Sequence, residues 1–261
     1  MLLTIDAGNT NVVFAVYDGG RQRGLWRCAT DAKRTADEYA VWLTQLLSLR
    51  GLYPRQISDA IIASVVPGAT FNLKRLCKDH FGTEPLIIGD PRIDLGVKAV
   101  VPRPEEVGAD RLVNAFAAAE TYQPPLIVVD FGTATTFDVV NGDGNYCGGV
   151  IAPGINLSLD ALDRAAAKLP LVEIVQPQQV IGTSTIACMQ SGIFWGYIGL
   201  IEGLVSRIRA EYQVSVPGAV MPVIATGGLS VLFARATSLI DHVDTELTLR
   251  GLVHIHQRNR A

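Results

Sequence analysis

Residues 3–11 of the chain read LTIDAGNTN, and residues 127–135 read IVVDFGTAT. In both stretches an apolar run ends in an aspartate, Asp6 or Asp130, and a glycine and a threonine follow within four residues. A second apolar run comes next and ends in a glycine-containing turn. This pattern predicts two strands joined by a tight loop, with a hairpin turn after them. Asp6 and Asp130 are separated by almost half of the 261 residues. The chain is therefore predicted to be a duplicated domain in which each half offers a phosphate-binding loop.

The rest of the chain alternates strands and helices in each half. The expected elements include helices over 35–49, 69–81, 108–122, 156–167 and 185–212, and strands over 59–66, 85–88 and 221–226. The strand over 221–226 resembles residues 61–64, a second sign of the duplication. Such alternation predicts an α/β fold in which a mixed or parallel sheet is covered by helices in both domains. We place the domains at residues 1–117 and 118–261. The segment around His254 and His256 is expected to be a strand or a frayed tail, and paired metal binding there is the less favoured interpretation.

The composition excludes several classes of protein. Hydrophobic residues make up 49% of the chain and charged residues 18%, which is typical of a packed globular core and not of a disordered chain. A net charge of −3 and a pI near 5.8 give no basic surplus for binding nucleic acid. We see no apolar run of the ~20 residues that a membrane span needs, and no leader sequence, so a cytoplasmic protein is expected. The four cysteines are far apart without a CxxC pair, and are expected to be reduced and mostly buried.

The two loops suit a triphosphate. Backbone N–H groups in a tight turn bind phosphate oxygens well, and glycine lets the backbone approach closely. Asp6 and Asp130 would repel phosphate directly, but each can hold a cation such as Mg²⁺ that bridges to it. A single loop of this kind is also an ordinary strand-to-turn signal. Two loops at equivalent places in two halves favour a nucleotide-dependent phosphotransferase.

A third motif, Gly108-Ala109-Asp110-Arg111, begins the alanine-rich helix. Phosphoryl transfer to an alcohol requires a base for the hydroxyl proton and a cation to balance charge on the transferred group. Asp110 and Arg111 provide both. The alternative is that Asp110 only favours the positive end of the helix dipole and Arg111 is a surface charge.

Taken together, these motifs resemble the type III pantothenate kinases. The resemblance rests on residues 6–11, 108–111, 130–135, 148–154, 182–192 and 225–228, which occur in the family's order. It implies two duplicated actin-like (ribonuclease H-like) domains, each a mixed sheet flanked by helices, with a nucleotide cleft between them. It also implies a homodimer that uses ATP and Mg²⁺ to phosphorylate the terminal hydroxyl of pantothenate, the first step of coenzyme A biosynthesis.

The same resemblance assigns roles to individual residues. ATP binding is implied for Asp6, Ala7, Gly8, Asn9, Thr10, Asn11, Val12, Val13, Thr133, Gly227 and Gly228. Pantothenate binding is implied for Val101, Gly108, Ala109, Asp110, Arg111 and Thr185, with Asp110 as the catalytic base. Asp130 matches the ligand of a monovalent cation, K⁺ or NH₄⁺. The chain departs from the family at Val101, where many members have a tyrosine that lines the pantothenate site.

Two rival hypotheses stay open at this stage. One is another kinase of the same superfamily that acts on a sugar or a small carboxylate, which Val101 leaves room for. The other is a non-catalytic protein that keeps the nucleotide cleft as a sensor or scaffold. An active enzyme is favoured by the retention of Asp6, Asp110, Arg111, Asp130 and Thr133.

Overall fold

The chain divides into two compact units in the computed structural model, which describes residues 1–165 and 172–260. The first unit holds residues 1–120 together with the C-terminal segment from Glu246, and the second holds residues 121–245. The division near residue 120 lies close to the boundary that we placed between residues 117 and 118. The C-terminal segment, which we had assigned to the second domain, instead packs with the first unit.

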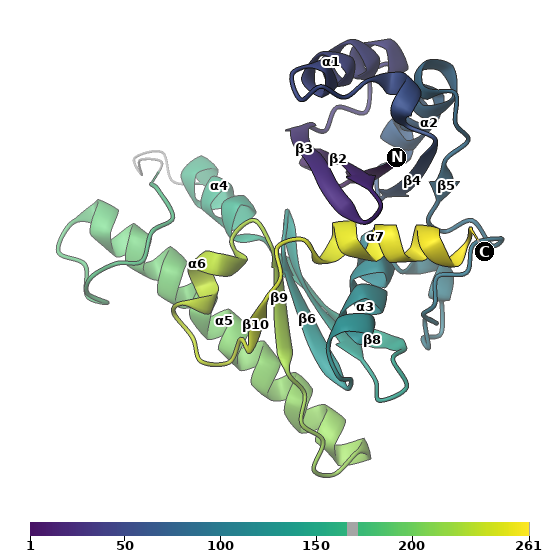
Figure 1. Ribbon diagram of the computed structural model, residues 1–261. Helices are drawn as coiled ribbons and strands as arrows, with labels where there is room; N and C mark the ends of the chain where they lie inside the picture. Colours follow the sequence, from purple (N-terminus) through teal and green to yellow (C-terminus); the bar gives the residue numbers. More distant parts are fainter. Residues whose placement is uncertain (166–171, 261) are drawn as a thin grey trace. The chain divides into compact units, whose positions relative to one another are not determined.

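The first unit is built on a five-stranded mixed sheet in the order β3-β2-β1-β4-β5 (Figure 1). Its strands are β1 (Leu2–Ala7), β2 (Asn11–Asp18), β3 (Arg21–Ala29), β4 (Asp59–Ser64) and β5 (Leu86–Ile87). β1 pairs antiparallel with β2 and parallel with β4. The expected strands over 59–66 and 85–88 are therefore present.

Helices cover both faces of this sheet. On one face Leu3 and Ile5 of β1 pack against α1 (Ala36–Ser48) and α2 (Pro67–Arg75), which continues into a π-helical turn, η2 (Leu76–His80). On the other face Leu2 packs with α3 (Ala109–Thr121) and α7 (Leu247–Arg258). Because side chains alternate along a strand, Asp6 lies on the face that α3 and α7 cover. Two 3₁₀ turns, η1 (Pro54–Gln56) and η3 (Pro104–Glu106), lie in the connections.

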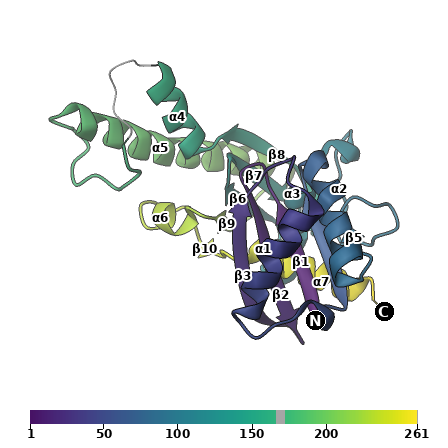
Figure 2. The same cartoon turned by 90° about the horizontal axis from the view of Figure 1, so that it is seen from above.

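The second unit repeats the topology with its own five-stranded sheet, in the order β10-β9-β6-β7-β8 (Figure 2). The strands are β6 (Leu126–Phe131), β7 (Ala134–Val140), β8 (Tyr146–Pro153), β9 (Val223–Gly227) and β10 (His242–Val243). β6 pairs antiparallel with β7 and parallel with β9, as β1 does with β2 and β4. The duplication predicted from the two loops is confirmed, and β9 and β4 occupy equivalent places.

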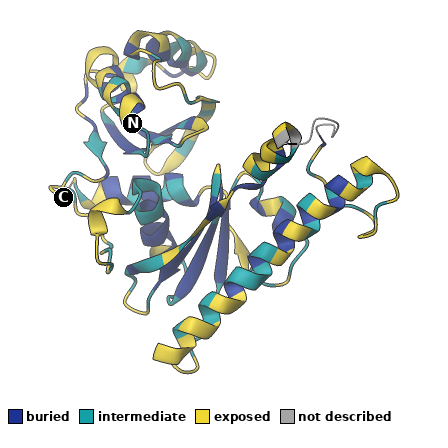
Figure 3. Ribbon diagram, turned by 180° about the vertical axis from the view of Figure 1, so that it is seen from behind, coloured by how far each residue is buried: buried dark blue, intermediate teal, exposed yellow. Residues whose placement is uncertain are grey.

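The helices of the second unit are α4 (Ile155–Ala165), α5 (Thr185–Ser215) and α6 (Ser230–Ala234). α5 lies along the sheet, with dark buried positions on its inner side and exposed ones on its outer side (Figure 3). Phe194 and Tyr197 of α5, Phe233 of α6 and Phe131 of β6 form an aromatic cluster in the core. The last two residues of the helix expected over 156–167 lie outside the described residues.

Two expectations from the sequence were wrong. The segment around His254 and His256 is the helix α7, because its apolar residues recur at helical spacing and bury one face. Of the four cysteines only Cys77 is fully buried, and Cys188 is exposed. Within the described residues, no helix is long and apolar enough to cross a membrane.

Candidate active site

The first loop joins β1 to β2 and is closed by its own backbone. The Gly8 N–H donates to the Asn11 carbonyl at 3.0 Å, so Asn9 and Thr10 form the turn. Thr30, just beyond β3, secures this turn through two hydrogen bonds. Its hydroxyl donates to the Gly8 carbonyl at 2.6 Å, and its N–H donates to the Thr10 carbonyl at 2.9 Å. These three hydrogen bonds together close the loop and hold its turn.

Exposure separates the residues of this loop into two groups. Asn9, Thr10 and Asn11 are exposed and able to meet a ligand. Ala7 and Val12 are buried and pair with each other across β1 and β2. The side chains of Ala7 and Val12 therefore pack in the core and support the loop.

The motif at residues 108–111 forms the start of α3. The Leu112 N–H donates to the Gly108 carbonyl at 3.2 Å, which makes Gly108 the residue that caps the helix. The Asp110 carboxylate folds back and accepts the Arg111 N–H at 2.8 Å. A Cβ on Gly108 would lie 2.6 Å from Asp110 Oδ1, so only glycine leaves room for the carboxylate in this position.

Burial changes the acidity of Asp110. Desolvation raises the pKa of this carboxyl above its ordinary value, although the Arg111 N–H and the Arg111 charge oppose the shift. A carboxylate near a helix N-terminus is usually stabilised as an anion, yet here burial outweighs that effect. A raised pKa strengthens Asp110 as a proton acceptor, as a general base requires.

The Asp110 turn and the first loop lie at the same end of the first unit. The Val65 N–H, just past β4, donates to the Ala7 carbonyl at 3.1 Å. The Val65 side chain also lies 3.6 Å from the position that a Cβ on Gly108 would occupy. Val65 therefore connects the end of β1, where Asp6 lies, with the turn that holds Asp110.

The second loop joins β6 to β7 and is one residue shorter than the first. Ala7 pairs with Val12 across residues 8–11, whereas Phe131 pairs with Thr135 across residues 132–134. The Gly132 N–H donates to the Ala134 carbonyl at 3.1 Å and closes the loop. The two loops are therefore equivalent in position but not in length.

Gly154, at the start of α4, packs directly on the second loop. Its N–H donates to the Thr133 carbonyl at 3.1 Å, and a Cβ on Gly154 would overlap Thr133 O and lie 2.6 Å from Gly132 O. Only glycine allows this approach. The N-terminal end of α4 is thus packed directly against the second loop.

Asp130 lies against the turn after β9. Gly227 has a φ of +88°, and a Cβ there would lie 2.6 Å from both Asp130 Oδ1 and the Phe131 carbonyl oxygen. The Ser230 hydroxyl donates to the Gly227 carbonyl at 2.7 Å and fixes the turn. The structure therefore brings together Asp130, the second loop and Gly227, three features that the sequence had singled out separately.

Other predicted residues are placed less tightly. Gly228 is exposed, and no described atom lies within 4 Å of a Cβ built on it. Thr185 is the exposed first residue of α5, directly after Ser184, whose side chain accepts the Ala187 N–H. Val101 is half-buried in the connection that precedes η3.

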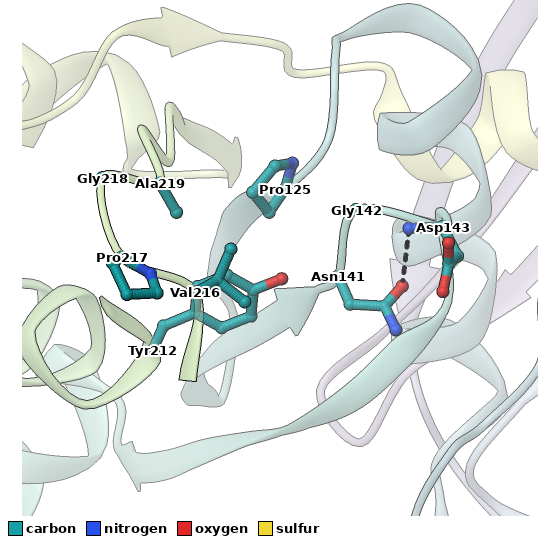
Figure 4. A pocket seen from close by; sticks show the side chains of 9 residues that line it. All are labelled: Pro125, Asn141, Gly142, Asp143, Tyr212, Val216, Pro217, Gly218 and Ala219. Carbon is teal, nitrogen blue, oxygen red and sulfur yellow. Dashed lines mark hydrogen bonds between the residues drawn. The ribbon is translucent and has the colours of Figure 1, made fainter. Parts of the chain in front are cut away.

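Two surface cavities in the second unit lie apart from these residues. One, of about 480 Å³, lies between the β7–β8 turn at Asn141–Asp143 and the C-terminal end of α5 (Figure 4). The other, of about 330 Å³, lies between β8 and the same end of the helix. Neither is lined by a residue that the sequence predicted for ligand binding. Among the described residues there is no cluster of three or more metal-binding side chains from His, Cys, Asp or Glu.

Sequence reasoning missed several residues that shape the site. Thr30, Val65 and Tyr197 carry no local motif, because each meets the loops only through the tertiary structure. Gly154 did have a signal, as the last residue of the glycine-rich block at 148–154, but its contact with the second loop was not foreseen.

Comparison with known proteins addresses the identity of this site. The family profile of type III pantothenate kinases matches residues 2–207. A type III pantothenate kinase of Paramagnetospirillum magneticum is 64% identical over 259 residues, covering 99% of this chain and 98% of that protein.

Solved structures resemble the fold at much lower identity. A Campylobacter jejuni protein described as a Baf family transcriptional activator has a TM-score of 0.60 at 19% identity, covering 99% of this chain and 98% of that one. A Sinorhizobium meliloti protein described as a 2-dehydro-3-deoxygalactonokinase has a TM-score of 0.58 at 14% identity, covering 99% and 96%. These likenesses, with the repeated sheet topology, confirm the predicted duplicated α/β fold of the actin-like kinases. The match over most of its length shows that the chain belongs to the type III pantothenate kinase family.

Proposed function

We propose that this protein transfers the γ-phosphoryl group of ATP to the terminal hydroxyl of pantothenate and forms 4′-phosphopantothenate, the first step of coenzyme A biosynthesis. Family membership supports the reaction, and the Asp110 turn is the observation that carries the mechanism. The protein is thus a phosphotransferase with an alcohol as acceptor. A reaction that consumes ATP also favours the cytoplasm as its location.

Asp110 acts as the base in this proposal. Its carboxylate, whose pKa burial raises, accepts the proton of the pantothenate hydroxyl while that oxygen attacks the γ-phosphorus. Gly108 leaves space for the carboxylate, and Arg111 provides positive charge beside it. Ala109 and Thr185 would contribute to the pantothenate pocket, with Val101 in place of an aromatic wall. Since phosphoryl transfer needs little covalent assistance, positioning of the hydroxyl accounts for much of the rate.

The two loops hold the triphosphate in this proposal. The exposed turn of residues 9–11 and the loop that contains Thr133 present backbone N–H groups and hydroxyl or amide side chains. The turn at Gly227 and Gly228 lies on the adenosine side. Mg²⁺ binds mostly to phosphates and water with one or two carboxylates, which agrees with the absence of a larger acidic cluster among the described residues.

Asp130 is proposed to bind the monovalent cation. The Asp130 carboxylate and the Phe131 carbonyl oxygen lie side by side against Gly227, each 2.6 Å from where a Cβ on that glycine would be. Alkali cations bind to carboxylate and carbonyl oxygens, so this pair is a chemically suitable part of a K⁺ site. When bound there, the cation would screen negative charge on the phosphates.

A homodimer is the proposed assembly, and the outer face of α5 supports it. Gly192, Gly196, Gly199 and Gly203 recur at intervals of four, three and four residues, so they share one helix face. No described atom lies within 4 Å of a Cβ built on the first three. Glycine inside a helix costs about 1 kcal/mol relative to alanine, and close approach of a second helix would compensate. A monomer by light scattering at micromolar concentration would contradict this assembly.

The test of the proposed function is an ADP-release assay with ATP and Mg²⁺, with and without pantothenate, in K⁺ and then in Na⁺. We expect turnover that requires pantothenate and rises when K⁺ replaces Na⁺. Turnover on a sugar or another carboxylate but not on pantothenate would identify the other kinase instead. ATP binding without turnover on any acceptor would favour the sensor or scaffold hypothesis.

A further inference from the structure

Tyr197 of α5 contacts a residue that precedes the second loop and a residue that follows it. Its ring lies 6.4 Å from that of Phe131, the residue between Asp130 and Gly132. Its hydroxyl forms a hydrogen bond with the Thr135 hydroxyl, where β7 begins. Ile155, the first residue of α4, lies in the same buried cluster as Tyr197. One side chain therefore meets the two arms of the loop and the helix that packs on it.

The contacts of Tyr197 are shielded from water. Tyr197 is 6% exposed, Thr135 is 1% exposed and Ile155 is 3% exposed. The ring also packs at 5.1 Å from Phe233 of α6, the short helix that follows the Gly227 turn. Because water does not reach this contact, loss of the Tyr197 hydroxyl would leave the buried Thr135 hydroxyl without this partner.

We propose that Tyr197 is a positioning residue that holds the second loop, and with it Thr133, in the conformation that binds the ATP phosphates. The inference deepens the proposed function and rests on its assignment of the second loop to ATP. Tyr197 acts through Thr135 and through the first turn of α4, without touching the nucleotide. Gly154 transmits this constraint, since its N–H binds the Thr133 carbonyl at 3.1 Å.

The test compares Tyr197→Phe with Tyr212→Phe. Phenylalanine keeps the ring in the aromatic cluster and removes only the hydroxyl. Tyr212 lies on the same helix about 22 Å farther along, beside the cavity of Figure 4, and serves as the matched control. Calorimetric titration with a non-hydrolysable ATP analogue measures nucleotide affinity without any acceptor. The measured affinity therefore does not depend on whether pantothenate is the substrate.

We expect Tyr197→Phe to weaken binding of the analogue by about five- to tenfold, because the loop would then adopt its binding conformation only part of the time. In turnover assays the KM for ATP should rise while the KM for pantothenate stays unchanged. Tyr212→Phe should match the wild type in both assays. Wild-type affinity in Tyr197→Phe, or equal weakening in both variants, would overturn the inference.

Thr135 provides a second, independent test. Thr135→Val removes the partner hydroxyl, whereas Thr135→Ser keeps it and should restore wild-type affinity. If Tyr197 and Thr135 act through one contact, the double variant Tyr197→Phe with Thr135→Val should bind no more weakly than either single variant. Additive losses would show that the contact does not position the loop. The comparison of Thr135→Val with Thr135→Ser keeps the inference testable even if Tyr197→Phe folds poorly.

Discussion

Gly227→Ala and Gly228→Ala should have very different effects on the stability of the protein, although the two glycines are adjacent. Gly227 has a φ of +88°, and the left-handed region costs a residue with a Cβ about 1–2 kcal/mol. The new Cβ would also lie 2.6 Å from both Asp130 Oδ1 and Phe131 O, an overlap of the kind that costs about 1–3 kcal/mol. The Gly227→Ala variant should therefore lose about 2–5 kcal/mol. Gly228→Ala meets no described atom within 4 Å, and its effect should stay within about 0.5 kcal/mol.

Thermal unfolding of the two variants beside the wild type measures this difference. For a chain of this size 1 kcal/mol corresponds to about 2–4 °C, so Gly227→Ala should lower Tm by at least about 4 °C. Gly228→Ala should leave Tm within about 2 °C of the wild type. Because the Asp130 carboxylate must move away from the new methyl group, Gly227→Ala should also lose most of the stimulation by K⁺.

Equal shifts of Tm in the two variants would refute the reasoning, since it depends on the different surroundings of Gly227 and Gly228. Retained stimulation by K⁺ in a destabilised Gly227→Ala variant would separate the two claims. The packing argument would then stand, and the assignment of the cation to Asp130 would fail.

Three further predictions concern the first unit. Asp110→Asn should reduce kcat by about 10²- to 10⁴-fold without changing Tm. It should also remove the acidic limb of the kcat/KM profile, which the raised pKa of Asp110 shifts to higher pH than an ordinary aspartate would give. An unchanged rate would exclude Asp110 as the base. Gly108→Ala would press a methyl group 2.6 Å from the Asp110 carboxylate, so kcat should fall while the KM for ATP does not, and steady-state kinetics on both substrates checks this. Burial lowers the pKa of His256 below its ordinary value of 6.5, although the nearby Asp59 opposes this shift. Just below pH 6.5 the histidine therefore binds a proton more readily in the unfolded chain than in the folded protein. The free energy of unfolding in urea should therefore fall as pH drops below about 6.5, and His256→Gln should reduce that slope; an identical slope would exclude His256 as the group responsible.

Much of the candidate site could be predicted from the sequence, because the motifs that mark it consist of neighbouring residues. An apolar strand followed by Asp, Gly and Thr specifies a tight loop wherever it occurs, and its recurrence at Asp6 and Asp130 revealed the duplication. The glycine before Asp110 marked the start of α3 in the same way. These features depend on neighbours within a few residues, so no knowledge of the tertiary structure was needed.

The prediction from the local sequence failed for the C-terminal helix. The alternation of His254 and His256 suggested a strand, but α7 buries Leu252, Val253 and Ile255 against the sheet of the first unit. The helix follows the second unit in sequence and packs with the first, a long-range contact that no pattern along the chain records.

The sequence by itself determined the duplicated α/β fold, the two loops, and the aspartates placed beside them. Only the tertiary structure decided which of two adjacent glycines is essential to the packing, that the second loop is one residue shorter, and that Tyr197 supports it. The physical reason is that strand, turn and helix-start signals act over a few residues. Close packing and buried hydrogen bonds instead join atoms that are distant in the chain, such as those of Tyr197 and Thr135.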